Sequence, residues 1–226
     1  RTMQIAQKLY QGVDIEGDTI GLITYMRTDG TQISNEAIST FREYITKNYG
    51  NNYCPDKPNN YSGKKAKNAQ EAHEAIRPAG SEFVHPDDIN FDGKEKALYE
   101  LIWKRTLASQ MKEATKSNMQ VKIEVDGAQF NANGSRIIFP GFLRVYVEGK
   151  DDPSAALDDK EVILPKLSVG QKLKLSDLES TRHQTNPPPR FTEASIVQRL
   201  EKEGIGRPST YASTMSTLVD RDYVRI

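Results

Sequence analysis

The sequence predicts an α+β protein: a mainly helical region, then a β-rich segment, then a pair of helices. Apolar residues recur every three or four positions over much of residues 1–112, which indicates amphipathic helices. Apolar and polar residues alternate over residues 119–126, which indicates a strand. Consecutive prolines at 187–189 then form a stiff linker before helical periodicity returns. We therefore expect three domains, at 1–112, 113–185 and 186–226.

The first region is predicted to contain three helices. One occupies the opening ten residues. The second begins after Ser34, whose hydroxyl can cap it, and ends by Gly50. The third covers roughly residues 94–112. The chain starts within a helical pattern and stops at what resembles the start of a strand, so we expect it to be an excerpt from a longer protein.

In the β-rich region, Gly127 is expected to turn the chain after the alternating strand. Further strands are predicted at 136–140, 143–147, 161–164, 171–176 and 178–185. In the last region, Thr192 can cap a helix that ends at Gly204, and Pro208 suits the first turn of the next. Two helices joined by a short glycine-containing turn predict a helix-turn-helix-like pair.

Composition narrows the classes of function. The chain has 31 basic and 31 acidic residues, so any binding of nucleic acid must come from local clusters. No apolar run approaches the roughly 20 residues that span a bilayer, so no membrane partner is expected. Cys54 is the only cysteine, which excludes intrachain disulfides and cysteine-based zinc sites. A reducing, cytoplasmic setting fits these features.

The most informative stretch is residues 21–30, GLITYMRTDG. In an extended backbone Tyr25, Arg27 and Asp29 would point to the same side, because side chains alternate between faces. A phenol oxygen, a guanidinium that matches phosphate and a carboxylate that can orient it suggest phosphoryl chemistry. The alternative is a half-buried strand with a polar face, and the residue types alone favour that alternative.

Two further stretches carry groups suited to phosphate. In residues 69–78, His73 and Arg77 would share one face if the segment is helical; the alternative is a surface histidine beside glutamates. The segment resembles a zinc motif only superficially, because arginine stands where the second metal ligand belongs. In residues 204–211, Arg207, Ser209 and Thr210 surround a predicted helix start, which can bind an anion or be an ordinary turn.

Together, residues 21–30, 70–78 and 203–224 resemble motifs of the bacterial type IA DNA topoisomerase family in residue identity, order and spacing. The resemblance covers essentially the whole chain. Met26 favours the topoisomerase I branch, since topoisomerase III-like members more often have proline there. The family usually has serine where this chain has Gly30. A glycine there removes no catalytic group and is expected to loosen the turn.

The resemblance implies that Tyr25 is the nucleophile that forms a transient 5′-phosphotyrosine in one DNA strand. Another strand then passes and the break is religated, which relaxes negatively supercoiled DNA without ATP. Arg27 would stabilise the phosphoryl group, Asp29 would orient Arg27, and His73 would support the active site. The residues implied in DNA contact are Gln7, Arg77, Arg207, Ser209 and Thr210.

The resemblance also implies what this chain lacks. In the family, Mg²⁺ is held by the acids of a toprim domain, and no metal ligand is assigned among these residues. We therefore expect an inactive internal fragment whose partners are single-stranded or underwound DNA and the toprim domain of the same polypeptide, in the cytoplasm of a bacterium. The rival hypothesis is a non-catalytic helix-turn-helix module that binds duplex DNA, although its second helix carries little Arg or Asn to read bases.

Overall fold

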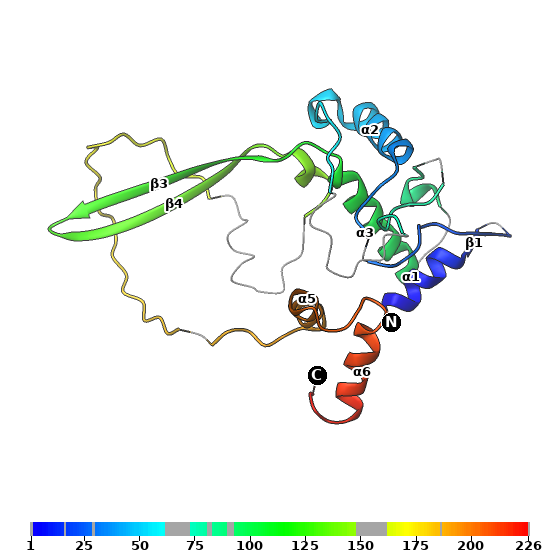
Figure 1. The fold of residues 1–226 in the computed structure, drawn as a ribbon. Coiled ribbons are helices and arrows are strands. Elements are labelled where there is room, and N and C mark those ends of the chain that lie inside the picture. Colours follow the sequence, from blue (N-terminus) through cyan, green and yellow to red (C-terminus); the bar gives the residue numbers. More distant parts are fainter. Residues whose placement is uncertain are drawn as a thin grey trace. The chain divides into compact units, whose positions relative to one another are not determined.

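The computed structural model describes residues 2–15, 17–28, 30–61, 73–80, 83–89, 93–147, 162–185 and 187–225. It confirms the α+β class (Figure 1). The elements in chain order are α1 (Thr2–Gln11), β1 (Val13–Ile15), β2 (Asp18–Ile20), α2 (Asn35–Tyr49), η1 (Asn51–Tyr53), η2 (Pro86–Asp88), α3 (Gly93–Ser109), β3 (Thr115–Val125), β4 (Ala128–Phe139), η3 (Gly141–Arg144), α5 (Glu193–Glu203) and α6 (Tyr211–Asp220).

The chain divides into two compact units. One contains residues 1–114, 140–148 and 197–226, and the other contains residues 115–139 and 149–196. The first unit holds the three motifs that the sequence singles out. None of the helices in the described residues is both long and apolar enough to cross a membrane.

The chain that leads to Tyr25 is attached to the last turn of α1 by a backbone hydrogen bond. The strands β1 and β2 form a short antiparallel hairpin that pairs Val13 with Ile20. After the hairpin, the N–H of Leu22 donates to the carbonyl oxygen of Leu9 at 2.8 Å. The last carbonyls of a helix have no partner within the helix, so this bond satisfies one of them. It returns the chain to α1 just before Tyr25.

The main core lies among α2, α3 and the loops beside them. Phe41 and Ile45 of α2 are buried, as are Trp103 and Leu107 of α3. In each helix the two buried residues stand four apart, so they lie on one face, and α2 is the clearly amphipathic helix of the two. An aromatic cluster joins the two helices through Phe83, whose ring lies 4.8 Å from that of Phe41 and stacks at 4.9 Å on that of Trp103.

The predicted ends of α2 are confirmed. The hydroxyl of Ser34 accepts from the N–H of Ala37 at 3.3 Å, which caps the first turn. Gly50, with φ of +100°, stops the helix and donates its N–H to the carbonyls of Ile45 and Thr46. The first turn of α2 is therefore rigidly defined, which matters because Ser34 also contacts the candidate site.

In the described part of the β-rich segment, β3 and β4 form one long hairpin, paired from Thr115 and Phe139 to Val125 and Ala128 (Figure 1). Asp126 and Gly127 both have positive φ, as a tight two-residue turn requires, so the predicted turn at Gly127 is confirmed.

Most of the other predicted strands are wrong. The prediction at 136–140 is the end of β4, but residues 143–147 form part of η3 and an irregular stretch. Within residues 162–185, the only ladder contact is a bridge between Val162 and Ser135. Alternating side chains favour a strand only when a neighbouring strand supplies hydrogen bonds, and the structure places none beside 171–185.

The C-terminal helical pair is confirmed, with one correction. Thr192 caps α5 by accepting the N–H of Ser195 at 3.1 Å, and Gly204 follows the helix with φ of +72°. Pro208 does not lie in the first turn of the second helix. It belongs to a separate turn before α6, which begins at Tyr211.

Candidate active site

The loop that contains Tyr25 is attached at its start to residues 73–79, an irregular segment far away in sequence. Thr24 donates its N–H to the carbonyl of Arg77 at 2.9 Å, and Ala79 donates to the carbonyl of Leu22 at 2.8 Å. These bonds frame the bridge that pairs residue 23 with residue 78. Beyond it, residues 24–28 form no strand, so the predicted strand is wrong for Tyr25 itself.

The same segment holds the far end of the loop. Ala75 donates its N–H to the carbonyl of Gln32 at 2.7 Å. Gly30 lies against the backbone of residues 73 and 74: a Cβ there would overlap the carbonyl oxygen of His73 and stand 2.9 Å from that of Glu74. Glycine therefore permits a close backbone approach here, and the expectation that it loosens the turn is wrong.

The side chain of Thr24 strengthens this attachment. Its hydroxyl donates to the carbonyl of Ala75 at 2.8 Å and accepts the N–H of Arg77 at 3.0 Å. One hydroxyl thus spans three residues of the neighbouring segment, directly before Tyr25 in sequence.

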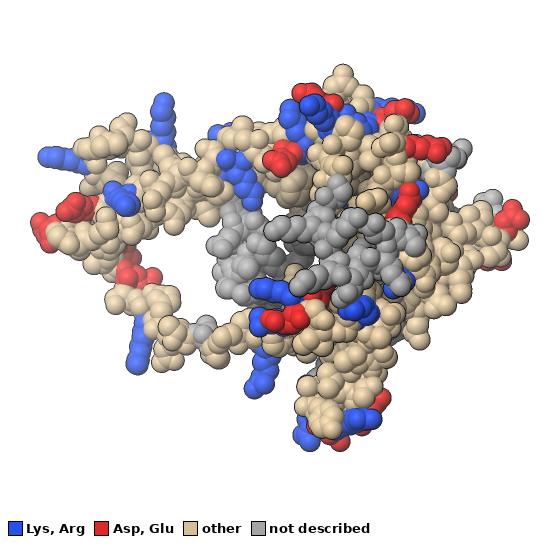
Figure 2. Space-filling view, viewed as in Figure 1, with Lys and Arg blue, Asp and Glu red and all other residues tan. Residues whose placement is uncertain are grey.

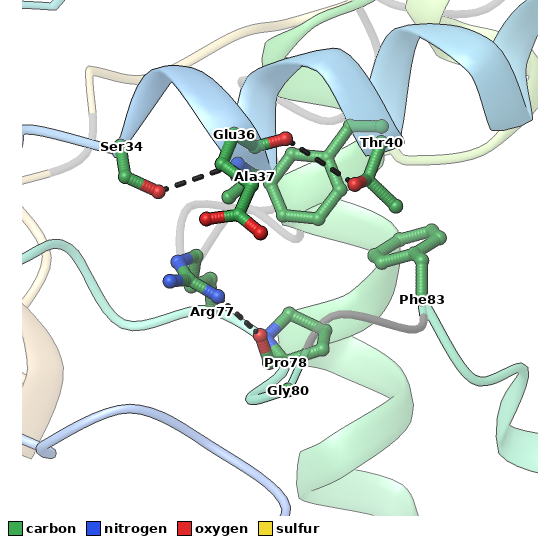
Figure 3. Close-up of a pocket in the computed structure, with 9 residues that line it drawn as sticks. Ser34, Glu36, Ala37, Thr40, Arg77, Pro78, Gly80 and Phe83 are labelled. Atoms are coloured by element: carbon green, nitrogen blue, oxygen red, sulfur yellow. Dashed lines mark hydrogen bonds between the residues drawn. The ribbon is translucent and has the colours of Figure 1, made fainter.

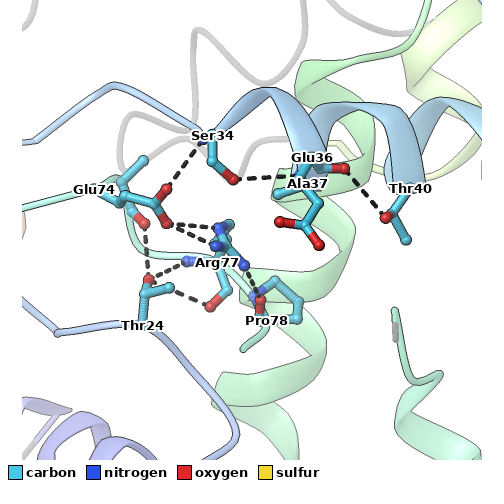
Figure 4. Close-up of polar contacts among 9 residues, drawn as sticks. Thr24, Ser34, Glu36, Ala37, Thr40, Glu74, Arg77 and Pro78 are labelled. Carbon is cyan, nitrogen blue, oxygen red and sulfur yellow. Dashed lines mark hydrogen bonds and ion pairs between the residues drawn. The ribbon is translucent and has the colours of Figure 1, made fainter. Parts of the chain in front are cut away.

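Glu74 and Arg77 connect the segment to α2. Arg77 donates from Nε and Nη2 to Oε2 of Glu74 at 3.0 and 2.7 Å (Figure 4). The other oxygen of Glu74 accepts the N–H of Ser34 at 3.1 Å. The side chain of Arg77 is only 12% exposed. A guanidinium so enclosed and paired is suited to holding the loop in place, while its predicted DNA contact stays a prediction.

The ring of Tyr25 contacts two other rings. The ring of Tyr10, from the last turn of α1, lies 5.2 Å away between centroids, and the imidazole of His73 lies 4.7 Å away. The side chain of Tyr25 is 37% exposed, so it is held but open to solvent. His73 does not share a helix face with Arg77 as predicted, because residues 73–79 are not helical.

The other predicted residues of this site are placed as follows. Arg27 is half-buried, two residues after Tyr25. Asp29 lies outside the described residues, so its predicted role stays a prediction. Gln7 is exposed on α1, one turn before Tyr10, and residues three apart are neighbours on a helix surface. The structure thus places Gln7 on the side of α1 that carries the neighbour of Tyr25.

The residues 206–210 form a compact turn before α6. The hydroxyl of Thr210 accepts the N–H of Arg207 at 2.9 Å and donates to its carbonyl at 3.1 Å. Arg207, Ser209 and Thr210 are exposed. The guanidinium of Arg207 and the hydroxyl of Ser209 are therefore exposed to solvent, whereas the hydroxyl of Thr210 is hydrogen-bonded within the turn.

A pocket of about 200 Å³ lies on the α2 side of Arg77 (Figure 3). Its lining is Ser34, Glu36, Ala37, Thr40, Phe41, Arg77, Pro78, Gly80 and Phe83. Tyr25 and His73 are not among these residues, so the pocket is separate from the ring cluster.

The distribution of charged side chains and of possible metal ligands can be compared with what the composition predicts. Among the residues coloured in Figure 2, lysines and arginines are interspersed with aspartates and glutamates. Among the described residues, no group of three His, Cys, Asp or Glu side chains is arranged to hold a metal ion. The predicted absence of a metal site therefore stays a prediction for the whole chain.

Sequence reasoning missed Tyr10, Thr24 and Glu74. Tyr10 is one helical turn after Gln7, and Thr24 is adjacent to Tyr25, so both positions could have been suspected. The pairing of Glu74 with Ser34 joins residues 40 apart in sequence and has no local signal.

Comparison with known proteins places these features in a family. A profile of the DNA topoisomerase family matches residues 1–226. DNA topoisomerase 1 of Synechococcus elongatus is 52% identical over 225 residues, covering 100% of this chain and 24% of the relative. The same enzyme of Streptomyces coelicolor is 51% identical over 228 residues, covering 99% of this chain and 23% of the relative.

A solved structure shows the same fold. Full-length topoisomerase I from Thermotoga maritima aligns with a TM-score of 0.73 and 32% identity, covering 99% of this chain and 34% of that chain. The chain thus spans about a quarter of the length of the curated relatives it matches. Since the family profile covers every residue, the chain belongs to the DNA topoisomerase family, among relatives named bacterial DNA topoisomerase 1.

Proposed function

We propose that the full-length protein is a type IA DNA topoisomerase and that Tyr25 is its nucleophile. The observation that carries the proposal is the setting of Tyr25: a part-exposed phenol, in contact with two other rings, in a loop attached at both ends to one segment. A nucleophile has to be both accessible and well oriented, and this setting supplies both properties.

In the proposed reaction the phenol oxygen of Tyr25 attacks the phosphorus of one backbone phosphodiester. A bond forms between this oxygen and phosphorus, and the bond from phosphorus to the 3′ oxygen breaks. The phenol proton leaves, and the 3′ oxygen gains a proton to become a hydroxyl. After strand passage the hydroxyl attacks the phosphotyrosine and reverses the step. Bond types are conserved throughout, so no ATP is required.

The neighbouring groups have roles that suit their positions. Arg27 would stabilise the negative charge that develops on the phosphoryl oxygens. His73 lies against the ring of Tyr25 and would orient it or contact the phosphate. Asp29 would orient Arg27, as the resemblance implies. For Arg77 the ion pair with Glu74 supports a positioning role over the predicted DNA contact.

DNA would be held by exposed polar groups on two elements. Gln7 on α1, and Arg207 and Ser209 before α6, are exposed and can donate hydrogen bonds to phosphate oxygens, whereas the hydroxyl of Thr210 donates within its own turn and would hold Arg207 in place. We propose single-stranded or underwound DNA as substrate, as the resemblance implies. Because such contacts are to the backbone, binding should weaken as salt rises.

Magnesium belongs to another part of the proposed enzyme. The described residues offer no cluster of ligands that fits Mg²⁺, which needs several oxygen ligands. We propose that a toprim domain of the same polypeptide binds Mg²⁺. The protein would act in the cytoplasm, where bacterial DNA lies.

Replacing Tyr25 with phenylalanine in the full-length protein tests the proposal. We expect relaxation of negatively supercoiled plasmid to be abolished and no covalent adduct to form on an oligonucleotide labelled 3′ of the cleavage point. Tyr223→Phe is a matched control, since Tyr223 is 70% exposed, and should behave like the parent protein. Relaxation by the Tyr25→Phe protein would refute the assignment.

A second experiment tests whether this chain is sufficient. We expect residues 1–226 alone to form no adduct with single-stranded DNA in the presence of Mg²⁺, because the metal ligands would be elsewhere. An adduct would show that the chain holds a complete site. If the chain instead preferred duplex of one sequence over single strands, the helix-turn-helix hypothesis would replace the catalytic one.

A further inference from the structure

We propose that Tyr10 is a positioning residue for the nucleophile: its ring limits the rotation of the Tyr25 ring. The inference rests on the proposed function, since it concerns the reaction assigned to Tyr25. It adds a residue outside all three motifs that the sequence singles out.

The contact between the two rings is specific in geometry. The centroids are 5.2 Å apart and the planes are inclined by 70°, an edge-to-face arrangement. Aromatic pairs prefer this arrangement because the positive edge of one ring meets the negative face of the other. His73 contacts the Tyr25 ring at 4.7 Å with an inclination of 51°. Two rings from different elements therefore restrain the nucleophile.

The backbone explains why the two tyrosines meet. The N–H of Leu22 donates to the carbonyl of Leu9, the residue before Tyr10. Gly21 lies so close that a Cβ on it would stand 2.8 Å from the carbonyl oxygen of Tyr10. The chain leading to Tyr25 is thus in close contact with the last turn of α1, and the ring contact follows from that attachment.

Exposure argues that the contact is not simply core packing. Tyr10 is 41% exposed and Tyr25 is 37% exposed, whereas Leu9 beside them is fully buried. Leu9 and Ala6 anchor α1 in the core, so the helix does not depend on Tyr10. A large ring kept at the surface beside the candidate nucleophile is therefore best explained by its effect on that nucleophile.

The test compares Tyr10→Ala, Tyr10→Leu and Tyr10→Phe in the full-length protein. Phenylalanine keeps the ring, leucine keeps apolar bulk without a ring, and Met3→Ala is the control on the same helix, since Met3 is 39% exposed. The probe is a single-stranded oligonucleotide. The measurements are the single-turnover rate of adduct formation at saturating DNA, the Kd, and the melting temperature.

We expect Tyr10→Ala and Tyr10→Leu to slow adduct formation by between about twofold and about tenfold, because an edge-to-face pair contributes no more than that to a rate. Tyr10→Phe should restore the parent rate, and Kd should be unchanged in all variants. If the alanine variant does not fold, the leucine variant decides by the same criteria.

Three results would overturn the proposal. Parent-like rates in both Tyr10→Ala and Tyr10→Leu would show that the ring has no effect. A raised Kd with an unchanged rate would make Tyr10 a DNA contact. A Tyr10→Phe rate as low as that of alanine would assign the effect to the hydroxyl. If the parent protein itself formed no adduct, the proposed function would fail instead, and the two failures are thereby distinguished.

Discussion

Replacing Glu74 with alanine is expected to detach the segment that carries His73 from the start of α2. The substitution removes the carboxylate that accepts two N–H groups of Arg77 and the N–H of Ser34. Arg77 is left as a charged group that is 12% exposed with its carboxylate partner gone. The loop of Tyr25 keeps its backbone bonds to residues 75–79 but loses this side-chain connection.

The magnitude follows from the burial of the pair. Removing one partner of a fully buried ion pair costs about 3–5 kcal/mol, and exposed pairs contribute about 0–1 kcal/mol. The side chains here are 12% and 35% exposed, which places the pair between these limits. We therefore expect a local cost of about 2 kcal/mol, which corresponds to an opening equilibrium about 30-fold more favourable.

Hydrogen exchange measures this opening directly, because amides exchange when the local structure opens. In Glu74→Ala, a peptide that contains the amide of Ala75, which donates to the carbonyl of Gln32, should exchange about 30-fold faster. The amide of Ser34 loses its acceptor in this variant, so its exchange should also rise but does not measure the opening. The amide of Lys112, which donates to the carbonyl of Tyr53, is remote and should be unchanged.

Glu100→Ala is the matched control. Glu100 pairs with Lys104 on the surface of α3, where both side chains are 43% exposed. We expect this variant to change exchange at Ser34 and Ala75 by less than about twofold. Equal exchange in Glu74→Ala and the parent protein would refute the claim that the carboxylate holds the two elements together.

Two further predictions concern the core and the root of the hairpin. Burial raises the pKa of Tyr99 from its ordinary 10.0 to about 12, and its hydroxyl donates to the carbonyl of Val84. The raised pKa stabilises the fold fully below pH 10. This contribution is lost as the pH rises towards 12, so the advantage over Tyr99→Phe in urea unfolding should shrink by about 3 kcal/mol; a pH-independent difference would contradict this. At Gly141, with φ of +50°, a Cβ would overlap the carbonyl oxygen of Lys112. Gly141→Ala should lower the melting temperature more than Gly170→Ala, whose Cβ meets nothing within 4 Å; equal shifts would show that the overlap relaxes without cost.

The parts of the fold that the sequence predicted share a physical basis in local pattern. The cap at Ser34, the end at Gly50 and the turn at Gly127 depend on residues within a few positions of one another. The strands predicted over 171–185 failed because a strand also needs a partner, and alternation does not show whether one is present.

In the candidate site, too, some features follow from local sequence motifs and others depend on contacts between distant segments. Tyr25 and His73 could be selected from the sequence because their motifs are short and distinctive. The shared helix face considered for His73 and Arg77 is not formed, because residues 73–79 are not helical and are bonded through their backbone to residues 22, 24 and 32. A local pattern cannot report such bonds, because each joins residues more than 40 apart in sequence.

The sequence by itself determined the family, the helices and the identity of the candidate nucleophile, because each of these depends on residues that are close together in the sequence. Only the tertiary structure decided that Tyr10 and His73 contact the ring of Tyr25, and that Glu74 binds Arg77 to the start of α2. These contacts depend on how the end of α1 and residues 73–79 pack against one loop. Packing of distant segments is decided by the whole fold, so no single motif contains it.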